Sequence, residues 1–148
     1  MRYCVSYGDP HIIQFESTRG SRRPRIDYHS FEEGDFLVFS YNGLEVWETQ
    51  VAQTFRWGDV ANNHAAWIQI HGTRVAQISS PYSDVEILDP EGAELIDISS
   101  NSQHYWPTRI RPGKFDNMIT FNNYTNIVVF LHPTSRLVTI LKFFFVSF

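Results

Sequence analysis

Apolar and polar residues alternate along most of this chain with the period of two that is typical of half-buried β-strands, and helical periodicity is almost absent. One run of strand-forming residues covers Phe36–Tyr41 and a second covers Leu44–Val51, with Asn42-Gly43 between them. Both Asn and Gly tolerate the positive φ angles of a type I′ turn. The pattern therefore predicts a β-hairpin that turns at Asn42-Gly43.

Two more hairpins are predicted further along the chain. The second would turn at Gly72-Thr73. The third would turn at Asp89-Pro90-Glu91-Gly92, where proline takes the first central position and glycine closes the turn. The strands that these turns would join are Trp67–Ile70 with Arg74–Ile78, and Asp84–Ile87 with Ala93–Ile98.

The remaining pattern predicts three later strands after a long loop at Ser99–Asn117, which is rich in Ser, Asn, Pro and Arg. About ten short strands separated by turns predict an all-β fold, a sandwich or a barrel, and we expect an antiparallel β-sandwich. No repeat or linker interrupts the chain, so residues 1–148 are expected to form a single domain. The later strands are Met118–Phe121, Ile127–Leu131 and Leu137–Val146, and the apolar run Leu137–Phe148 is expected to be a central strand or to be covered by a neighbouring module.

Composition limits the classes of function. Hydrophobic residues make up 43% of the 148 residues, and 12 Phe, 7 Tyr and 4 Trp supply enough buried area for a core without metals or disulfides. Cys4 is the only cysteine, so the chain forms no internal disulfide and no CxxC zinc site. A formal net charge of −4 gives no global attraction to nucleic acid or to an anionic membrane. The sequence contains no apolar run of about 18 residues, so it predicts no membrane-spanning helix.

The most informative segment begins at Cys4 and contains Gly8-Asp9-Pro10-His11, followed by Phe15. Gly8 permits unusual backbone angles, while Pro10 fixes its own φ and pushes Asp9 into an extended conformation. The Asp9 carboxylate can accept hydrogen bonds from nearby backbone N–H groups, and His11 can hold the turn from the other side. These residues are therefore expected to build a strand-to-turn corner.

This segment resembles the opening of von Willebrand factor type D domains, which have a cysteine, three residues, Gly-Asp-Pro-His, and a phenylalanine four positions after the histidine. The likeness covers about the first hundred residues and ends after Ile98. It departs from the family at Phe15-Glu16-Ser17, where Phe-Asp-Gly is usual, and in having no pair of cysteines. The further segments that carry it are Glu33–Val38 and Leu44–Gln50, similar to the second and third strands, and Asn62–Ile70 with Gly72 and Val75, similar to the next hairpin.

The resemblance implies a secreted, non-catalytic module with a structural, assembly or interaction role in an extracellular matrix, cell-surface or filament protein. Such a module would be cut from a longer chain, and any signal peptide would lie upstream, because Met1–Cys4 lacks an apolar stretch. The expected partners are other modules of the same polypeptide or a second copy. Nucleic acid and direct membrane insertion are not expected.

Self-cleavage is an alternative function, because in some members of the family the Asp-Pro bond of this motif breaks without a protease. The Asp9 side chain would attack its own carbonyl carbon, form an anhydride and expel the Pro10 nitrogen, with His11 as a proton donor. Asp89-Pro90 has the same dipeptide without the flanking Gly and His, so it provides an internal control.

Glycan binding is a third hypothesis, since aromatic rings offer flat apolar area with a polar edge. Four arginines at 19, 22, 23 and 25 could also contact anionic groups, and Arg22-Arg23-Pro24-Arg25 resembles a basic processing site; a solvated loop is the simpler interpretation. The candidate aromatic residues are Trp47, Trp57, Trp67, Trp106, Tyr41, Tyr82 and Tyr105.

Metal binding and hydrolase chemistry receive little support from the sequence. The acidic residues around the third predicted hairpin could hold calcium, but they lack an Asp-x-Asp-x-Asp spacing. The six histidines are scattered, and no Gly-x-Ser-x-Gly motif occurs. Asn123-Tyr124-Thr125 is a glycosylation sequon at Asn123, consistent with a secreted glycoprotein. The acidic residues are Asp84, Glu86, Asp89, Glu91, Glu94 and Asp97, and the histidines are His11, His29, His64, His71, His104 and His132. No cofactor is expected.

Overall fold

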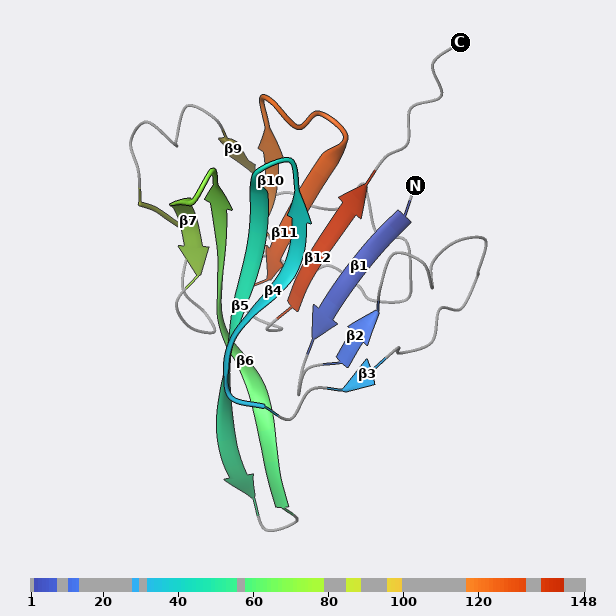
Figure 1. Cartoon of the computed structure of the whole chain (residues 1–148), viewed down its shortest axis with the longest axis vertical. Helices are drawn as coiled ribbons and strands as arrows, with labels where there is room; N and C mark the ends of the chain where they lie inside the picture. Colours follow the sequence, from blue (N-terminus) through green and yellow to red (C-terminus); the bar gives the residue numbers. More distant parts are fainter. Residues whose placement is uncertain are drawn as a thin grey trace.

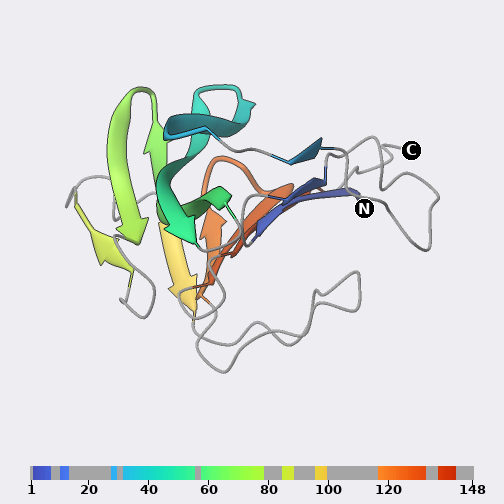
Figure 2. The same ribbon diagram turned by 90° about the horizontal axis from the view of Figure 1, so that it is seen from below.

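Two antiparallel β-sheets form the described part of the chain in a computed structural model, and every regular element in that part is a strand. The predicted all-β sandwich is therefore confirmed, and the described residues form twelve strands. Figures 1 and 2 show the two sheets as layers, with the blue and orange strands in one layer and most of the green strands in the other. The structure describes residues 2–7, 11–13, 28–29, 32–55, 58–78, 85–88, 96–99, 117–132 and 137–142.

One sheet has seven strands in the order β3-β2-β1-β12-β11-β10-β9, so the two ends of the chain meet in its middle. β1 pairs with β12 through five residue pairs, from Arg2 with Lys142 to Ser6 with Val138. The strands are β1 (Arg2–Tyr7), β2 (His11–Ile13), β3 (Tyr28–His29), β9 (Ile96–Ser99), β10 (Asn117–Phe121), β11 (Ile127–His132) and β12 (Leu137–Lys142).

The other sheet has five strands in sequence order from β4 to β8. Its strands are β4 (Gly34–Tyr41), β5 (Leu44–Phe55), β6 (Gly58–Ile70), β7 (Thr73–Ile78) and β8 (Glu86–Ile87). β5 and β6 are much longer than the sequence pattern predicts, and their far ends extend as a two-stranded ribbon beyond the other strands (Figure 1). Residues 52–55 and 58–60, which no predicted strand covered, therefore belong to this ribbon.

The hydrophobic core lies between the two sheets and takes side chains from both. Full burial of one Leu or Ile side chain contributes roughly 1.5–3 kcal/mol, so this layer is the main source of stability. The seven-stranded sheet contributes Cys4, Ile96, Ile119, Phe121, Ile127, Val129, Leu131 and Ile140, and the five-stranded sheet contributes Phe39, Leu44, Val46, Ala66, Ile68, Ile70, Val75, Ala76 and Ile78.

β11 is buried on both of its faces. Val129 and Leu131 belong to the core between the sheets, whereas Val128 and Phe130 point to the opposite face and are still only 8% and 1% exposed. The next strand, β12, lies between β1 and β11, which confirms that the described part of the apolar run from Leu137 is a central strand. Residues 143–148 of that run lie outside the described residues.

The predicted Asn42-Gly43 turn is confirmed, and the second turn is displaced by one residue. Asn42 and Gly43 have φ angles of 47° and 86°, as a type I′ turn requires. The second turn uses His71 and Gly72, with φ angles of 48° and 81°, and Thr73 already pairs with Ile70. The prediction of Gly72-Thr73 was wrong because it did not allow a histidine at positive φ.

The third predicted hairpin is wrong. β8 pairs with β7 in the five-stranded sheet, whereas β9 pairs with β10 in the seven-stranded sheet. The connection that contains Asp89-Pro90 therefore passes from one sheet to the other, and its own residues 89–95 lie outside the described residues. Local turn residues favour a hairpin, but the partner of each strand is set by the sheet in which its apolar side chains are buried.

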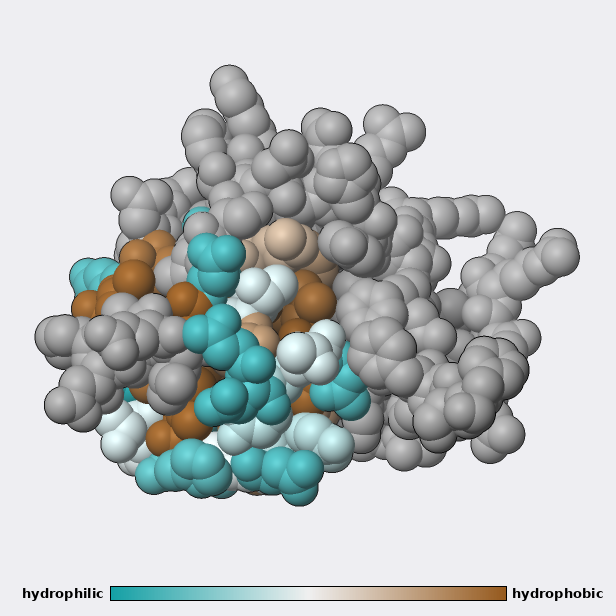
Figure 3. All heavy atoms as spheres, turned by 90° about the horizontal axis from the view of Figure 1, so that it is seen from above, coloured by the Kyte–Doolittle hydropathy of each residue, from teal (hydrophilic) through white to brown (hydrophobic). Residues whose placement is uncertain are grey.

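Contacts between turns join the sheets at one end of the sandwich. The Tyr124 hydroxyl, in the β10–β11 loop, donates a hydrogen bond of 2.7 Å to the Asn42 carbonyl oxygen. The His71 backbone N–H donates one of 2.8 Å to the Gly43 carbonyl oxygen. Figure 3 views this end, where hydrophilic residues form much of the described surface. The β4–β5 turn is thus held both by the neighbouring turn and by the opposite sheet.

Replacing Gly43 with alanine is expected to destabilise the chain more than replacing Gly72, a matched position. Both residues have positive φ, which costs an alanine about 1–2 kcal/mol. A Cβ atom at Gly43 would also lie 2.4 Å from Nδ1 of His71, whereas one at Gly72 would meet nothing within 4 Å. Urea unfolding of the two variants tests this; an equal or larger loss for Gly72→Ala would contradict the turn packing described here.

Candidate functional site

The Gly-Asp-Pro-His corner connects the first two strands of the seven-stranded sheet. β1 ends at Tyr7, β2 begins at His11, and these two residues are paired in register. His11 also pairs with His29 of β3, so its backbone lies inside the sheet. Gly8, Asp9, Pro10 and Phe15 lie outside the described residues. Residues 8–10 therefore connect two strands that pair with each other, and the roles expected of Gly8, Asp9 and Pro10 in the turn stay predictions.

Four buried polar side chains lie between the sheets close to this corner, and we call them the polar clasp: Ser6, Glu48, Gln50 and Asn63. Their exposed fractions are 0%, 1%, 2% and 5%. Ser6 belongs to the seven-stranded sheet, and the other three residues belong to the five-stranded sheet. The clasp therefore joins the two layers through hydrogen bonds.

Glu48 accepts hydrogen bonds at the centre of the clasp. Its Oε1 atom accepts one from the Ser6 hydroxyl at 2.9 Å and one from Nε2 of Gln50 at 3.0 Å. The Ser6 oxygen in turn accepts a hydrogen bond of 3.0 Å from Nδ2 of Asn63. The second carboxyl oxygen of Glu48, Oε2, is buried and makes no hydrogen bond.

The protonation of Glu48 follows from this environment. Burial raises the pKa of the Glu48 carboxyl above its ordinary value, and the hydrogen bonds from Ser6 and Gln50 oppose that shift in part. A proton on Oε2 breaks no hydrogen bond, because only Oε1 accepts one. Protonation of Glu48 is therefore easier than that of a solvent-exposed glutamate, and the burial of the clasp keeps Glu48 from an external substrate.

Cys4 lies two residues before Ser6 on the same face of β1 and is 4% exposed. Because its thiol belongs to the core, a disulfide to another chain would require β1 to leave the sheet. We expect a thiol reagent to label the native chain roughly a thousandfold more slowly than the denatured chain, since labelling needs an opening that costs about 4 kcal/mol or more. Equal labelling rates in the two states would contradict this packing.

The outward side of the five-stranded sheet carries a row of side chains built around two tryptophans. Trp47 and Trp67 are paired in register, and their rings are parallel within 1° with centroids 6.1 Å apart. The Arg74 guanidinium carbon lies 4.1 Å from the centroid of the Trp67 ring. Leu37 is paired with Trp47 at the other end of the stack and is 48% exposed.

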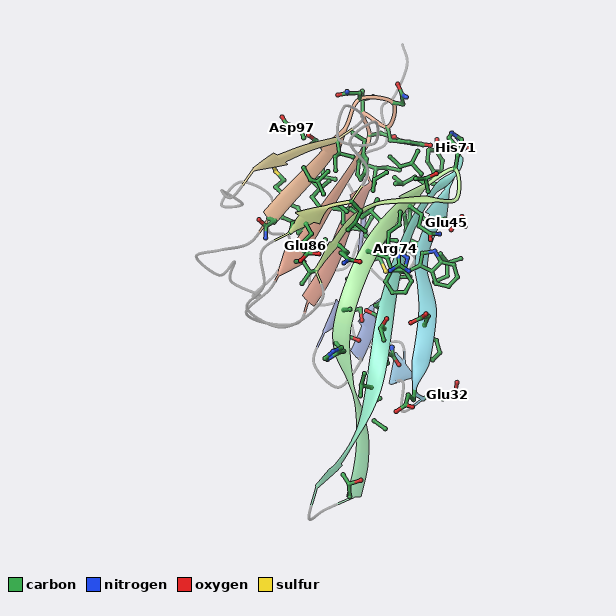
Figure 4. The ribbon with its side chains drawn as sticks, turned by 90° about the vertical axis from the view of Figure 1, so that its left-hand side faces the viewer. Glu32, Glu45, His71, Arg74, Glu86 and Asp97 are labelled. Carbon is green, nitrogen blue, oxygen red and sulfur yellow. The ribbon has the colours of Figure 1, made fainter. Side chains whose placement is uncertain are left out.

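Three carboxylates surround this stack, each oriented by neutral donors. Glu45 Oε2 accepts hydrogen bonds from Nε1 of Trp47 at 2.9 Å and from Nε2 of Gln69 at 3.0 Å. Asp35 accepts one of 2.7 Å from the Thr49 hydroxyl, and Glu86 accepts one of 3.0 Å from Nε2 of Gln77. Figure 4 shows Glu45 and Arg74 on this side of the sheet. We call the whole set the acidic–aromatic face: Asp35, Leu37, Glu45, Trp47, Thr49, Trp67, Gln69, Arg74, Gln77 and Glu86.

The structure brings together only part of the aromatic set predicted for glycan binding. Trp47 and Trp67 are adjacent, but Tyr41 packs instead on Tyr124, with ring centroids 6.5 Å apart. Trp67 is only 6% exposed, which leaves little ring surface for a sugar to stack on. Trp57, Trp106, Tyr82 and Tyr105 lie outside the described residues.

Two of the six acidic residues considered for calcium lie in the described part of the chain, and they belong to different sheets. Glu86 lies on β8 and Asp97 on β9, in different sheets, and the other four lie outside the described residues. Among the described residues, no group of three or more His, Cys, Asp or Glu side chains is arranged to hold a metal ion. No helix in that part of the chain has the length and apolar character needed to cross a membrane.

Asn123 and Thr125 of the sequon are exposed in the β10–β11 loop, while Tyr124 between them is buried. The Asn123 side chain is thus accessible at the surface, and its glycosylation stays a prediction. The Arg19–Arg25 run lies outside the described residues. Comparison with protein-family models, with curated proteins and with solved structures found no match for this chain.

Proposed function

We propose that this chain is a non-catalytic β-sandwich module, similar to von Willebrand factor type D modules, that serves assembly or interaction in an extracellular matrix, cell-surface or filament protein. The observation that carries the proposal is the distribution of the polar side chains. The polar clasp is sealed between the sheets and joins them, whereas the acidic–aromatic face is organised by hydrogen bonds and open to a partner.

The order of the elements supports this proposal. Within the segment that resembles the family's opening, residues 4–7 lie on β1 and residues 11–13 lie on β2. The segments that resemble its next strands form β4, β5 and β6, which pair in sequence order. The polar clasp takes one residue from β1 and three from the other sheet, so it holds the corner's first strand against the second layer.

Analytical ultracentrifugation at increasing concentration tests the proposal. We expect the chain to associate, and we expect Leu37→Lys to weaken that association because Leu37 is the exposed end of the tryptophan stack. Leu88→Lys is the matched control: it is the same substitution at a residue that is 42% exposed and lies outside the face. A monomeric chain, or equal behaviour of both variants, would contradict the interaction role of this face.

Self-cleavage at Asp9-Pro10 is a second candidate, which the pairing of Tyr7 with His11 favours. A three-residue connection closed at both ends restricts the conformations of the bond within it. The Asp9 carboxylate would attack its own carbonyl carbon and form a cyclic anhydride. The C–N bond would then break, and the Pro10 nitrogen would leave as a protonated secondary amine. Water would hydrolyse the anhydride.

Denaturing mass spectrometry after incubation in mild acid tests this candidate. Because β1 is paired with β12 through five residue pairs, a cleaved N-terminal peptide is expected to stay bound until the chain is denatured. Cleavage would give a fragment that begins at Pro10, would be absent in Asp9→Asn, and would spare Asp89-Pro90. An intact wild-type chain, or equal cleavage at both Asp-Pro bonds, would count against it.

A further inference from the structure

The acidic–aromatic face has a net negative charge that its own residues do not balance. Asp35, Glu45 and Glu86 bring three negative charges, and Arg74 brings one positive charge, which leaves a formal charge of −2. The hydrogen-bond donors to these carboxylates are a hydroxyl, an indole and two amides, all neutral. Such carboxylates, fixed in place beside apolar rings, favour a cationic partner.

One cation already lies against an indole on this face. The Arg74 guanidinium lies 4.1 Å from the Trp67 ring centroid, at the distance of a cation–π contact. Trp47 is only partly buried, and Leu37 beside it is 48% exposed. A second guanidinium at the Leu37 end of the stack would contact the edge of the Trp47 indole and the Leu37 side chain. The Asp35 and Glu45 carboxylates lie two residues along β4 and β5 from these side chains.

The chain itself contains a segment with this chemistry. Arg19, Arg22, Arg23 and Arg25 lie within seven residues, in a chain with 12 Lys and Arg and a net charge of −4. Guanidinium groups bind carboxylates through two parallel hydrogen bonds and stack on aromatic rings, which lysines do less well. Leu37, Asp35 and Glu86 are exposed, so other parts of the same molecule do not cover these side chains.

We infer that the acidic–aromatic face binds the Arg19–Arg25 segment of a second copy of this chain. The inference rests on the proposed assembly function and names its partner. Each copy has one face and one arginine segment. Reciprocal exchange would close a dimer, and one-way contacts would continue as a chain of modules. Because the contact is ionic and near the surface, salt is expected to weaken it.

Sedimentation equilibrium with charge-reversed variants tests the inference. One variant reverses the segment, Arg22→Glu with Arg23→Glu, and the other reverses the face, Asp35→Lys with Glu86→Lys. Each alone is expected to raise the dissociation constant by about tenfold or more. An equimolar mixture is expected to recover association, because the acidic segment of one variant meets the basic face of the other.

Asp97→Lys is the control, since it reverses a single negative charge at an exposed residue of the other sheet. Urea unfolding of every variant verifies that folding is retained. If the mixture fails to associate while Leu37→Lys still weakens the wild-type contact, this inference is overturned and the proposed function stands. If Leu37→Lys also has no effect, both fall. Binding of an oligoarginine peptide to a chain that never self-associates would overturn the second copy as the partner.

Discussion

Glu48→Gln is expected to make the chain more stable than the wild type at neutral pH, by a margin that grows as the pH rises. Burial raises the pKa of Glu48 in the folded chain above its ordinary value of 4.5. Between this ordinary pKa and the raised folded pKa, Glu48 is protonated in the folded state and ionised in the unfolded state. The contribution of this proton to the stability of the wild type is therefore fully present at pH values below the ordinary pKa. This contribution is lost as the pH rises through the folded pKa, at up to about 1.4 kcal/mol per pH unit. Glutamine is neutral throughout and keeps an acceptor oxygen for Ser6 and Gln50.

Urea unfolding across about pH 4 to pH 8 measures this difference between the variant and the wild type. Glu45→Gln is the matched control, because it is the same change three residues earlier on the outward side of β5, where Glu45 is partly exposed. We expect it to change the free energy of unfolding by less than about 0.5 kcal/mol at neutral pH. A difference between Glu48→Gln and the wild type that stays constant with pH would contradict a raised pKa of Glu48 in the folded chain.

Phe130→Ala is expected to cost about 3–5 kcal/mol of unfolding free energy, the range for a buried phenylalanine. Phe130 is 1% exposed although it faces away from the core between the sheets. In a sandwich whose outer face was open to water at this point, the same substitution would cost little. The prediction therefore tests whether the seven-stranded sheet is covered over β11 as well as beneath it.

Leu37→Ala provides the comparison on the outward face of the other sheet. Leu37 is 48% exposed, so its truncation is expected to cost less than about 0.5 kcal/mol. Denaturant unfolding of both variants, with the slope of the transition compared to the wild type, gives the two values. Similar small losses for Phe130→Ala and Leu37→Ala would mean that Phe130 is accessible in solution.

The sequence predicted the elements whose signals are local. The Asn42-Gly43 turn is specified by two adjacent residues, and the strands that flank it follow from their alternating side chains. The long apolar run from Leu137 is typical of a strand in the middle of a sheet, and β12 lies between β1 and β11. These features depend on neighbours in the chain, which a sequence pattern records directly.

Features that depend on distant partners were missed. The strands before and after Asp89-Pro90 belong to different sheets, because β8 pairs with β7 and β9 pairs with β10. No local sequence pattern indicates these partners. The polar clasp was also missed, although the alternation contains its signal. Leu44 and Val46 point inward, so Glu48 and Gln50 continue the inward register and interrupt an apolar series. Only the partner strand, which supplies Ser6, explains why polar side chains are tolerated there.

The division between a structural interior and a functional surface is tested most directly by comparing Leu37→Lys and Glu48→Gln in the same sedimentation equilibrium and unfolding experiments. Leu37→Lys is expected to weaken association and leave the free energy of unfolding nearly unchanged. Glu48→Gln is expected to change that free energy with pH and leave association unchanged. The opposite result, in which the buried Glu48 governs association and the exposed Leu37 does not, would contradict the proposed role of the acidic–aromatic face.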